Sequence, residues 1–198
     1  MLIVVRHGRT EHNASGLLLG HIDPPLDELG RQQAEALAAA VGPVDRVITS
    51  PLLRTRQTAA AFGVEPEVDE RWIELDYGDY DGVPLGEIRA ETWQQWRTDA
   101  DFAPPNGESM RQLGERVGAA LDDLAADGSA AERTTVIVTH VSPIKAAMCW
   151  ALGVDDLVAW RLWVATASIT RIGTTPRGGV VHTFNEVAHL ENAGLTGR

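Results

Sequence analysis

Residues 1–8 restrict the fold of this chain more than any other stretch. Residues 2–5 (Leu-Ile-Val-Val) form an unbroken apolar run, which is typical of a strand with both faces buried in a parallel sheet. Arg6, His7 and Gly8 follow it directly. Ligands of open α/β sheets bind at the carboxyl ends of strands, so a cation and an imidazole here predict an anion site with a nucleophile or a base. The alternative for His7 is a structural histidine of the core.

Apolar runs with strand and helix patterns alternate along the rest of the chain. This alternation predicts an α/β fold, here a single three-layer α/β/α domain over residues 1–198 with a mostly parallel central sheet. A helical, lid-like insertion is expected at about residues 84–128. Further strands are expected at 45–49, 65–68, 134–139, 165–172 and 180–184, and helices at 28–41, 51–59, 87–97, 108–126 and 143–152.

Three of these helices have a short polar residue directly before them. Asp27, Ser50 and Ser142 occupy these positions, and such side chains accept hydrogen bonds from the first free N–H groups of a helix. Pro51 after Ser50 also suits a first helical position. We therefore expect all three residues to be N-caps.

Charge and cysteine content restrict the class of partner. The chain has 17 Lys and Arg against 28 Asp and Glu, a net charge of −11, which argues against nucleic acid. Arg6 and His7 interrupt the first apolar run, which argues against a signal peptide, and no run has the length of a membrane span. The single cysteine, Cys149, fits a reducing compartment. We expect a cytoplasmic protein with a small-molecule partner and no membrane contact.

Three predicted strands end in residues that can carry chemistry. The first ends at Arg6 and His7, the second runs into a segment from Ser50 to Arg54, and strand 134–139 ends at His140. The carboxyl ends of parallel strands share one edge of a sheet, so these groups should converge. Guanidinium groups bind phosphate oxygens in a bidentate fork, and a neutral imidazole can attack phosphorus. The pattern predicts phosphoryl transfer.

Hydrolysis of a phosphoester also needs an acid for the leaving oxygen and a base for water. The acidic, aromatic and glycine-rich segment 71–86 has the composition of a pocket wall, and we select Glu74 from it. The neighbouring Asp76, Asp79 and Asp81 make a solvated loop carboxylate the alternative for this residue.

Four ordered blocks resemble the histidine phosphatase superfamily, in the branch that includes cofactor-dependent phosphoglycerate mutases and small phosphatases. They are the RHGRTEHN stretch from Arg6 to Asn13, SPLLRTRQTA at 50–59, IELDYGDYDG at 73–82, and the strand that ends in Thr139-His140. A PNGES segment at 105–109 and a terminal FNEVAHL at 184–190 fit the family's usual order. The resemblance covers nearly the whole chain and implies a phosphoglycerate mutase-like fold.

The resemblance also implies roles for single residues. His7 would be the phosphorylated nucleophile and Glu74 the proton donor, with no metal and no cofactor. The phosphoryl group would be bound by Arg6, Arg54 and His140, with Asn13 as a further donor. Two positions depart from the family pattern: Arg9 stands where Glu is usual, and Val141-Ser142 follow the second histidine where many relatives carry Gly. The N–H of Val141 is expected to serve the phosphoryl group.

The chain lacks the longer insertion of the mutases and its acidic segment looks like the phosphatase form, so the resemblance favours a phosphatase. We expect a phosphomonoesterase of the histidine acid phosphatase type, acting on a small phosphorylated metabolite. The alternatives are a phosphoglycerate mutase, a catalytically silent phosphate-binding module, and a ribonuclease-like enzyme with paired histidines.

Several further residues have more than one interpretation. Trp93, Trp96, Trp160 and Trp163 suit a core better than a substrate pocket. Asn185 and His189 are expected to hold the C-terminal segment, and the Trp-rich segment 150–163 is compatible with a homodimer.

Overall fold

The computed structural model describes residues 1–127, 133–175 and 178–197. In this part of the chain, strands form one sheet in the order β3-β2-β4-β1-β5-β6. The pairs β1–β4, β4–β2 and β2–β3 are parallel, whereas β5 runs antiparallel to β1 and β6 antiparallel to β5. The strands are β1 (Leu2–Arg6), β2 (Arg46–Thr49), β3 (Glu67–Val68), β4 (Thr135–Thr139), β5 (Ile169–Thr175) and β6 (Gly178–Glu186).

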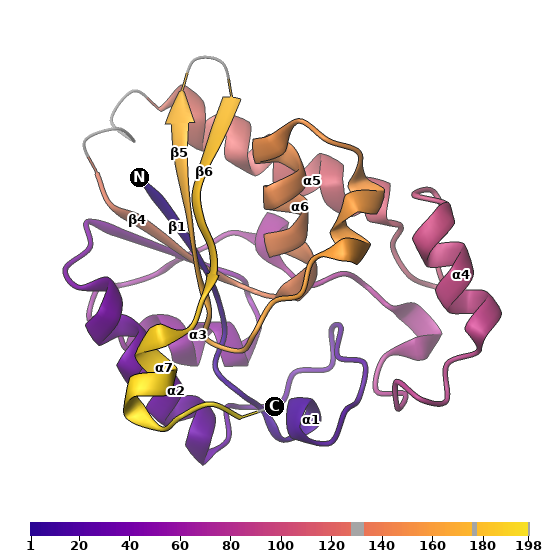
Figure 1. The fold of residues 1–198 in the computed structure, drawn as a ribbon, viewed down its shortest axis with the longest axis horizontal. Helices are drawn as coiled ribbons and strands as arrows, with labels where there is room; N and C mark the ends of the chain where they lie inside the picture. The colour runs from indigo at the N-terminus through magenta and orange to yellow at the C-terminus, as the bar shows by residue number, and fades with distance from the viewer. Residues whose placement is uncertain (128–132, 176–177, 198) are drawn as a thin grey trace.

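Helices cover both faces of this sheet, which confirms the three-layer prediction. On one face lie α5 (Met110–Ala126) and α6 (Val141–Leu152), and on the other lie α2 (Glu28–Val41), α3 (Leu53–Ala60) and α7 (Ala188–Ala193) (Figure 1). The remaining helical elements are α1 (Glu11–Ala14), α4 (Ala90–Thr98) and the 3₁₀ turns η1 (Glu70–Trp72), η2 (Gly78–Tyr80) and η3 (Asp156–Arg161).

The alternation of side chains along β1 builds the two cores. Leu2 and Val4 belong to the core cluster that includes Leu113 of α5, and Ile3 and Val5 to the cluster that includes Leu37 of α2. All four β1 side chains are at most 2 % exposed. A strand with apolar residues on both faces is therefore buried on both faces, as the sequence predicts.

The segment predicted as a lid divides into two parts. Helix α4 lies at the right-hand edge of the view, away from the sheet (Figure 1), and its Trp96 is fully buried among aromatic rings that include Tyr77, Phe102 and Trp160. Helix α5 packs along α6. That these helices act as a lid stays a prediction.

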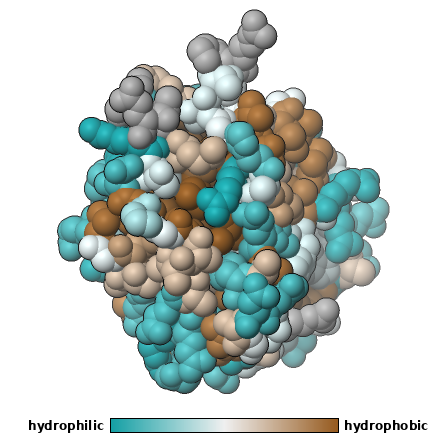
Figure 2. All heavy atoms as spheres, turned by 60° about the vertical axis from the view of Figure 1, so that its left-hand side comes forward, coloured by the Kyte–Doolittle hydropathy of each residue, from teal (hydrophilic) through white to brown (hydrophobic). Residues whose placement is uncertain are grey.

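Hydrophilic residues dominate the outline of the face shown in Figure 2, with apolar residues between them. Over the described ranges, no helix combines the length and the apolar character needed to span a membrane.

The predicted N-cap of α2 is confirmed. Oδ1 of Asp27 accepts from the N–H of Gly30 at 2.7 Å, and Oδ2 accepts from Nε of Arg9 at 2.8 Å. The arginine that departs from the family pattern is therefore an ion-pair partner of this cap.

The other two predicted caps are wrong. Helix α3 starts two residues later than expected and has Leu52 as its N-cap, without a side-chain bond, because the Ser50 hydroxyl lies 2.8 Å from His140. Helix α6 starts at Val141 and has His140 as its N-cap, because the carboxylate of Glu74 accepts the first N–H groups of the helix. Tertiary partners have replaced the local caps.

Two glycines bring the first loop against α2. A Cβ added at Gly8 would lie 2.2 Å from the carbonyl oxygen of Gly30, and one added at Gly30 would lie 2.0 Å from the carbonyl oxygen of Arg9. These distances are far below any van der Waals contact, so both positions exclude a side chain. The contact fixes where the loop after β1 runs.

We predict that Gly30→Ala destabilises the protein, although alanine favours a helix interior by roughly 1 kcal/mol. The added methyl group has to displace backbone, which typically costs about 1–3 kcal/mol. Urea denaturation measures the free energy of unfolding. Gly86→Ala is the control, since no atom lies within 4 Å of its added Cβ, and it should stay within about 0.5 kcal/mol of the wild type. Equal stability of both variants would show that the loop adapts freely.

Candidate active site

The three predicted strand ends meet at one edge of the sheet. Arg6 is paired with Thr139 and Thr49 with Val138, so His7 and His140 follow at matching positions and Ser50 lies one position earlier, beside Thr139. All three side chains are at most 2 % exposed. The rings of His7 and His140 pack edge to face, with their centroids 5.1 Å apart. The convergence expected from the sequence is present in the structure.

The His7 imidazole is held in one tautomer. Its Nδ1 donates to the carbonyl oxygen of Gly8 at 2.7 Å, so the proton is on Nδ1 and the lone pair is on Nε2. Burial lowers the pKa of His7 well below its ordinary 6.5, and the charges of Arg54 and Arg6 lower it further. The ring is therefore neutral at physiological pH, as a nucleophile has to be.

Arg54 and His140 form a second hydrogen-bonded unit. Nε of Arg54 donates to Nδ1 of His140 at 3.3 Å, while its two Nη atoms donate to the carbonyl oxygens of Gly20 and Ile22. The Nε2 of His140 then donates to Oγ of Ser50 at 2.8 Å. Burial lowers the pKa of His140 well below 6.5, and the neighbouring Arg54 acts in the same direction. A second neutral imidazole thus faces the site.

Sequence reasoning assigned Ser50 to a helix cap and missed its contact with His140. The strand ends indicate where Ser50 lies, because it follows the end of β2 as His7 and His140 follow the ends of β1 and β4. They do not indicate which group its hydroxyl contacts.

Arg6 directs its guanidinium toward the loop that follows η3. Nη1 donates to the carbonyl oxygen of Val164 at 2.9 Å, and the buried Nε finds no acceptor among the described residues. Burial lowers the pKa of Arg6 to about 10, while Glu74 acts to raise it, so Arg6 is charged at neutral pH. A charged donor without an acceptor fits an anionic ligand such as phosphate.

The loop that receives Arg6 is fastened to the C-terminal part of the chain. The N–H of Ala165 donates to Oδ1 of Asn185 at 2.8 Å, and Nε2 of His189 donates to the carbonyl oxygen of Ala167 at 3.1 Å. Asn185 and His189, expected to hold the C-terminal segment, thus tie it to this loop.

Glu74 lies at the N-terminus of α6 and is only 3 % exposed. Its carboxylate accepts from the N–H groups of Leu75 at 2.8 Å, Val141 at 3.1 Å and Ser142 at 3.1 Å. A helix N-terminus favours a negative charge, so these bonds hold the carboxylate in place. The N–H of Val141, which the sequence assigned to the phosphoryl group, donates to Glu74 instead.

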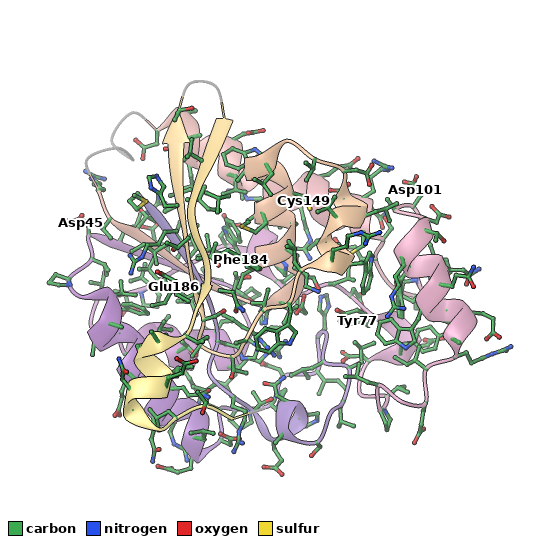
Figure 3. The ribbon with its side chains drawn as sticks, in the orientation of Figure 1. Asp45, Tyr77, Asp101, Cys149, Phe184 and Glu186 are labelled. Atoms are coloured by element: carbon green, nitrogen blue, oxygen red, sulfur yellow. The ribbon has the colours of Figure 1, made fainter. Side chains whose placement is uncertain are left out.

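Donors from outside also fix the backbone at Glu74. Its carbonyl oxygen accepts from Nε2 of His21 at 2.9 Å and from Nη2 of Arg116 at 3.1 Å. Tyr77, from the same loop (Figure 3), has its hydroxyl 3.1 Å from Oγ of Ser142. None of these three roles was predictable from the sequence, because each depends on which loops lie side by side.

A cavity of about 790 Å³ opens beside Arg6 and Asn13. Asn13 uses its Oδ1 to accept from the N–H of Thr10 at 3.1 Å, which completes a capping box in α1. Trp163 also lines this cavity and is 65 % exposed. The expectation of a core position is therefore confirmed for Trp96 and wrong for Trp163.

Across residues 1–127, 133–175 and 178–197, no three His, Cys, Asp or Glu side chains are grouped as a metal ion would require.

Known proteins resemble this chain over almost its full length. A phosphoserine phosphatase of Hydrogenobacter thermophilus is 32% identical over 96% of this chain and 93% of its own length. A probable phosphoglycerate mutase of Serratia proteamaculans is also 32% identical, over 97% and 95%. A solved mutant phosphoserine phosphatase from Entamoeba histolytica, in complex with phosphoserine, has a TM-score of 0.86 at 27% identity and covers 96% of this chain and 98% of that one.

A family model, the histidine phosphatase superfamily (branch 1), matches residues 2–187. This range contains the three strand ends, the two buried arginines Arg6 and Arg54, and Glu74, whose carboxylate caps α6. The paired histidines at the edge of a mixed α/β sheet, together with this match, show that the chain belongs to the histidine phosphatase superfamily.

Proposed function

We propose that this protein hydrolyses phosphomonoesters of small metabolites through a phosphohistidine on His7. The observation that carries the proposal is the fixed tautomer of His7, whose Nε2 lone pair lies in a buried site that also contains two arginines. The membership of the family and the relatives named phosphoserine phosphatase support the same reaction class.

In the first half of the reaction, Arg6 and Arg54 bind the nonbridging oxygens of the phosphoryl group, with the amide of Asn13 as a further donor. His140 joins them as a donor when its proton is on Nδ1, with Nε2 then accepting from the Ser50 hydroxyl. Nε2 of His7 attacks phosphorus in line and forms the P–N bond as the P–O bond to the leaving oxygen breaks. Glu74 enters this step protonated and delivers its proton to that oxygen, so the alcohol departs neutral and the carboxylate is left ready to accept a proton from water. Arginine pairs suit this role because guanidinium groups stabilise the charge on the transferred group.

In the second half, water attacks the phosphohistidine while Glu74 accepts its proton. The P–N bond breaks, inorganic phosphate leaves, and His7 regains its lone pair. Ser50 acts as a positioning residue here, since its hydroxyl fixes the His140 ring that faces the phosphoryl group.

A phosphoglycerate mutase is the second candidate, because a relative of that name is as similar as the phosphatase. A mutase returns the phosphoryl group to a bound phosphoglycerate instead of to water. That relative is matched over 95% of its own length, so the missing insertion does not separate the two functions, and the products of the reaction have to.

We also propose a cytoplasmic location. Cys149 is a buried thiol whose pKa burial raises to about 11, which fits an inert cysteine in a reducing compartment. A homodimer through residues 150–163 stays a prediction.

We predict that His7→Ala abolishes the release of inorganic phosphate from phosphomonoesters, whereas His12→Ala, the control, keeps it. In ³¹P NMR, the wild type should release phosphate from several monoesters, and EDTA should leave the rate unchanged. Conversion of 3- to 2-phosphoglycerate without phosphate release would identify a mutase. Loss of activity on chelation, restored by Mg²⁺, would contradict the metal-independent mechanism.

Glu74→Gln should slow the hydrolysis of alkyl phosphates about 10²–10⁴-fold, the usual worth of general acid catalysis. Hydrolysis of p-nitrophenyl phosphate should slow much less, because p-nitrophenolate leaves without a proton. Steady-state kcat with both substrates measures the difference. Glu87→Gln, an exposed carboxylate outside the site, is the control. Equal slowing of both substrates would remove Glu74 from the acid role.

The lowered pKa values of His7 and His140 predict their behaviour with pH. Both rings stay neutral in the folded protein at pH 6.5, where an unfolded chain is half protonated. The folded state therefore loses stability as the pH falls below about 6.5. Heteronuclear NMR of the imidazole carbons, in native protein and in urea, measures both titrations. Native midpoints at or above 6.5 would contradict two buried neutral rings.

A further inference from the structure

The cavity beside Arg6 is where the organic part of a substrate finds room. It measures about 790 Å³. Tyr77, Ser142 and Lys145 line a second cavity of only about 20 Å³, which is the space of roughly one water molecule. Arg6 would hold the phosphoryl group at the edge of the large cavity, so the rest of the ester extends into it.

The walls of this cavity are mainly apolar. Leu17, Leu85 and Trp163 come from three separate segments, and Val187 and Leu190 from the chain near α7. Leu85 is 44% exposed and Trp163 is 65% exposed. Large apolar side chains left open to water at a cavity mouth are typical of a binding surface for an apolar ligand.

The charged residues that line the cavity also favour an uncharged organic group. Among the described residues that line the cavity, Arg6 is the only Lys or Arg and Glu191 the only Asp or Glu. In the proposed reaction, Arg6 binds the phosphoryl group and is not available to a second anionic group. A carboxylate on the organic part of the substrate would therefore meet Glu191 without a cation to balance it, which like-charge repulsion disfavours.

We propose that the site selects phosphomonoesters with an apolar organic group and discriminates against those that carry a carboxylate. Trp163 and Glu191 are the specificity-determining residues. This inference rests on the proposed phosphatase function. It separates the chain from the relatives whose names specify phosphoserine or phosphoglycerate, since both of those compounds carry a carboxylate.

Matched substrate pairs test the preference. O-phosphoethanolamine and O-phosphoserine differ by one added carboxylate, and 3-phosphoglycerate has a carboxylate where glycerol 3-phosphate has a hydroxymethyl group. Phenyl and 2-naphthyl phosphate differ by one ring and have leaving groups of similar basicity. We expect kcat/KM to be about tenfold higher for the member without a carboxylate, and about tenfold higher for the naphthyl ester than for the phenyl ester.

Variants assign these ratios to the two side chains. Glu191→Lys should reduce the discrimination against the carboxylate at least fivefold, whereas Glu35→Lys, which changes the net charge equally on an exposed part of α2, should leave it unchanged. Trp163→Ala should remove the preference for the naphthyl ester through KM. Leu152→Ala, a 52% exposed side chain outside the cavity, should preserve it.

A binding measurement separates this inference from the proposed function. Dissociation constants of the same six esters with His7→Ala protein, from titration calorimetry, require no turnover. If the order of affinities follows the expected ratios while the wild type hydrolyses none of the esters, the inference holds and the hydrolase proposal fails. If the wild type hydrolyses esters but prefers the carboxylated members, or if Glu191→Lys and Glu35→Lys act alike, the inference is overturned.

Discussion

The hydrogen bond from Nδ1 of His7 to the carbonyl oxygen of Gly8 is the constraint on which the site depends. It sets the tautomer, and it requires the Gly8 peptide to keep one orientation. The N–H of Gly8 donates to Oγ1 of Thr58 in α3, and its Cα lies too close to Gly30 of α2 for any side chain. Helices α2 and α3, which lie on the same face of the sheet, thus position the Gly8 peptide, and that peptide positions Nε2 of His7.

The electrostatics of the site are opposite to those of the whole protein. The net charge is −11, yet Arg6 and Arg54 lie beside two neutral histidines, with Glu74 as the nearby carboxylate that acts to raise the pKa of both arginines. Burial makes these local charges count, because solvent screens them less than charges on the surface. An anionic ester is therefore attracted by the site itself, whereas the surface as a whole repels it.

The sequence predicts the parts of this site that follow from strand ends. Buried apolar runs identified β1 and β4, and the parallel arrangement brought His7 and His140 together. The role of Ser50, the start of α6 and the partner of Val141 were not predictable in this way. Each depends on a tertiary contact: Ser50 turns to His140, and Glu74 arrives from a distant loop to cap α6. Local capping preferences cannot include partners 67 to 90 residues away in the sequence.

The prediction of a core position for Trp163 was wrong for a related reason. Tryptophans at helical spacing predict a core, and Trp96 follows the rule because aromatic rings surround it. Trp163 lies after the end of η3 and is 65% exposed. Its spacing from Trp160 has no meaning once the helical turn has ended.

The groups proposed for the chemistry and the walls of the large cavity come from different classes of structure. His7, His140 and Arg54 are buried at the sheet edge and in the first turn of α3, where most substitutions would cost folding free energy. The walls come from the loop after α1, from residues 163–166 and from the chain near α7. Substitutions there can accumulate with little effect on stability. Natural variation can therefore change which ester is accepted while the reaction stays the same. One fold can in this way give rise to enzymes with different substrate specificities.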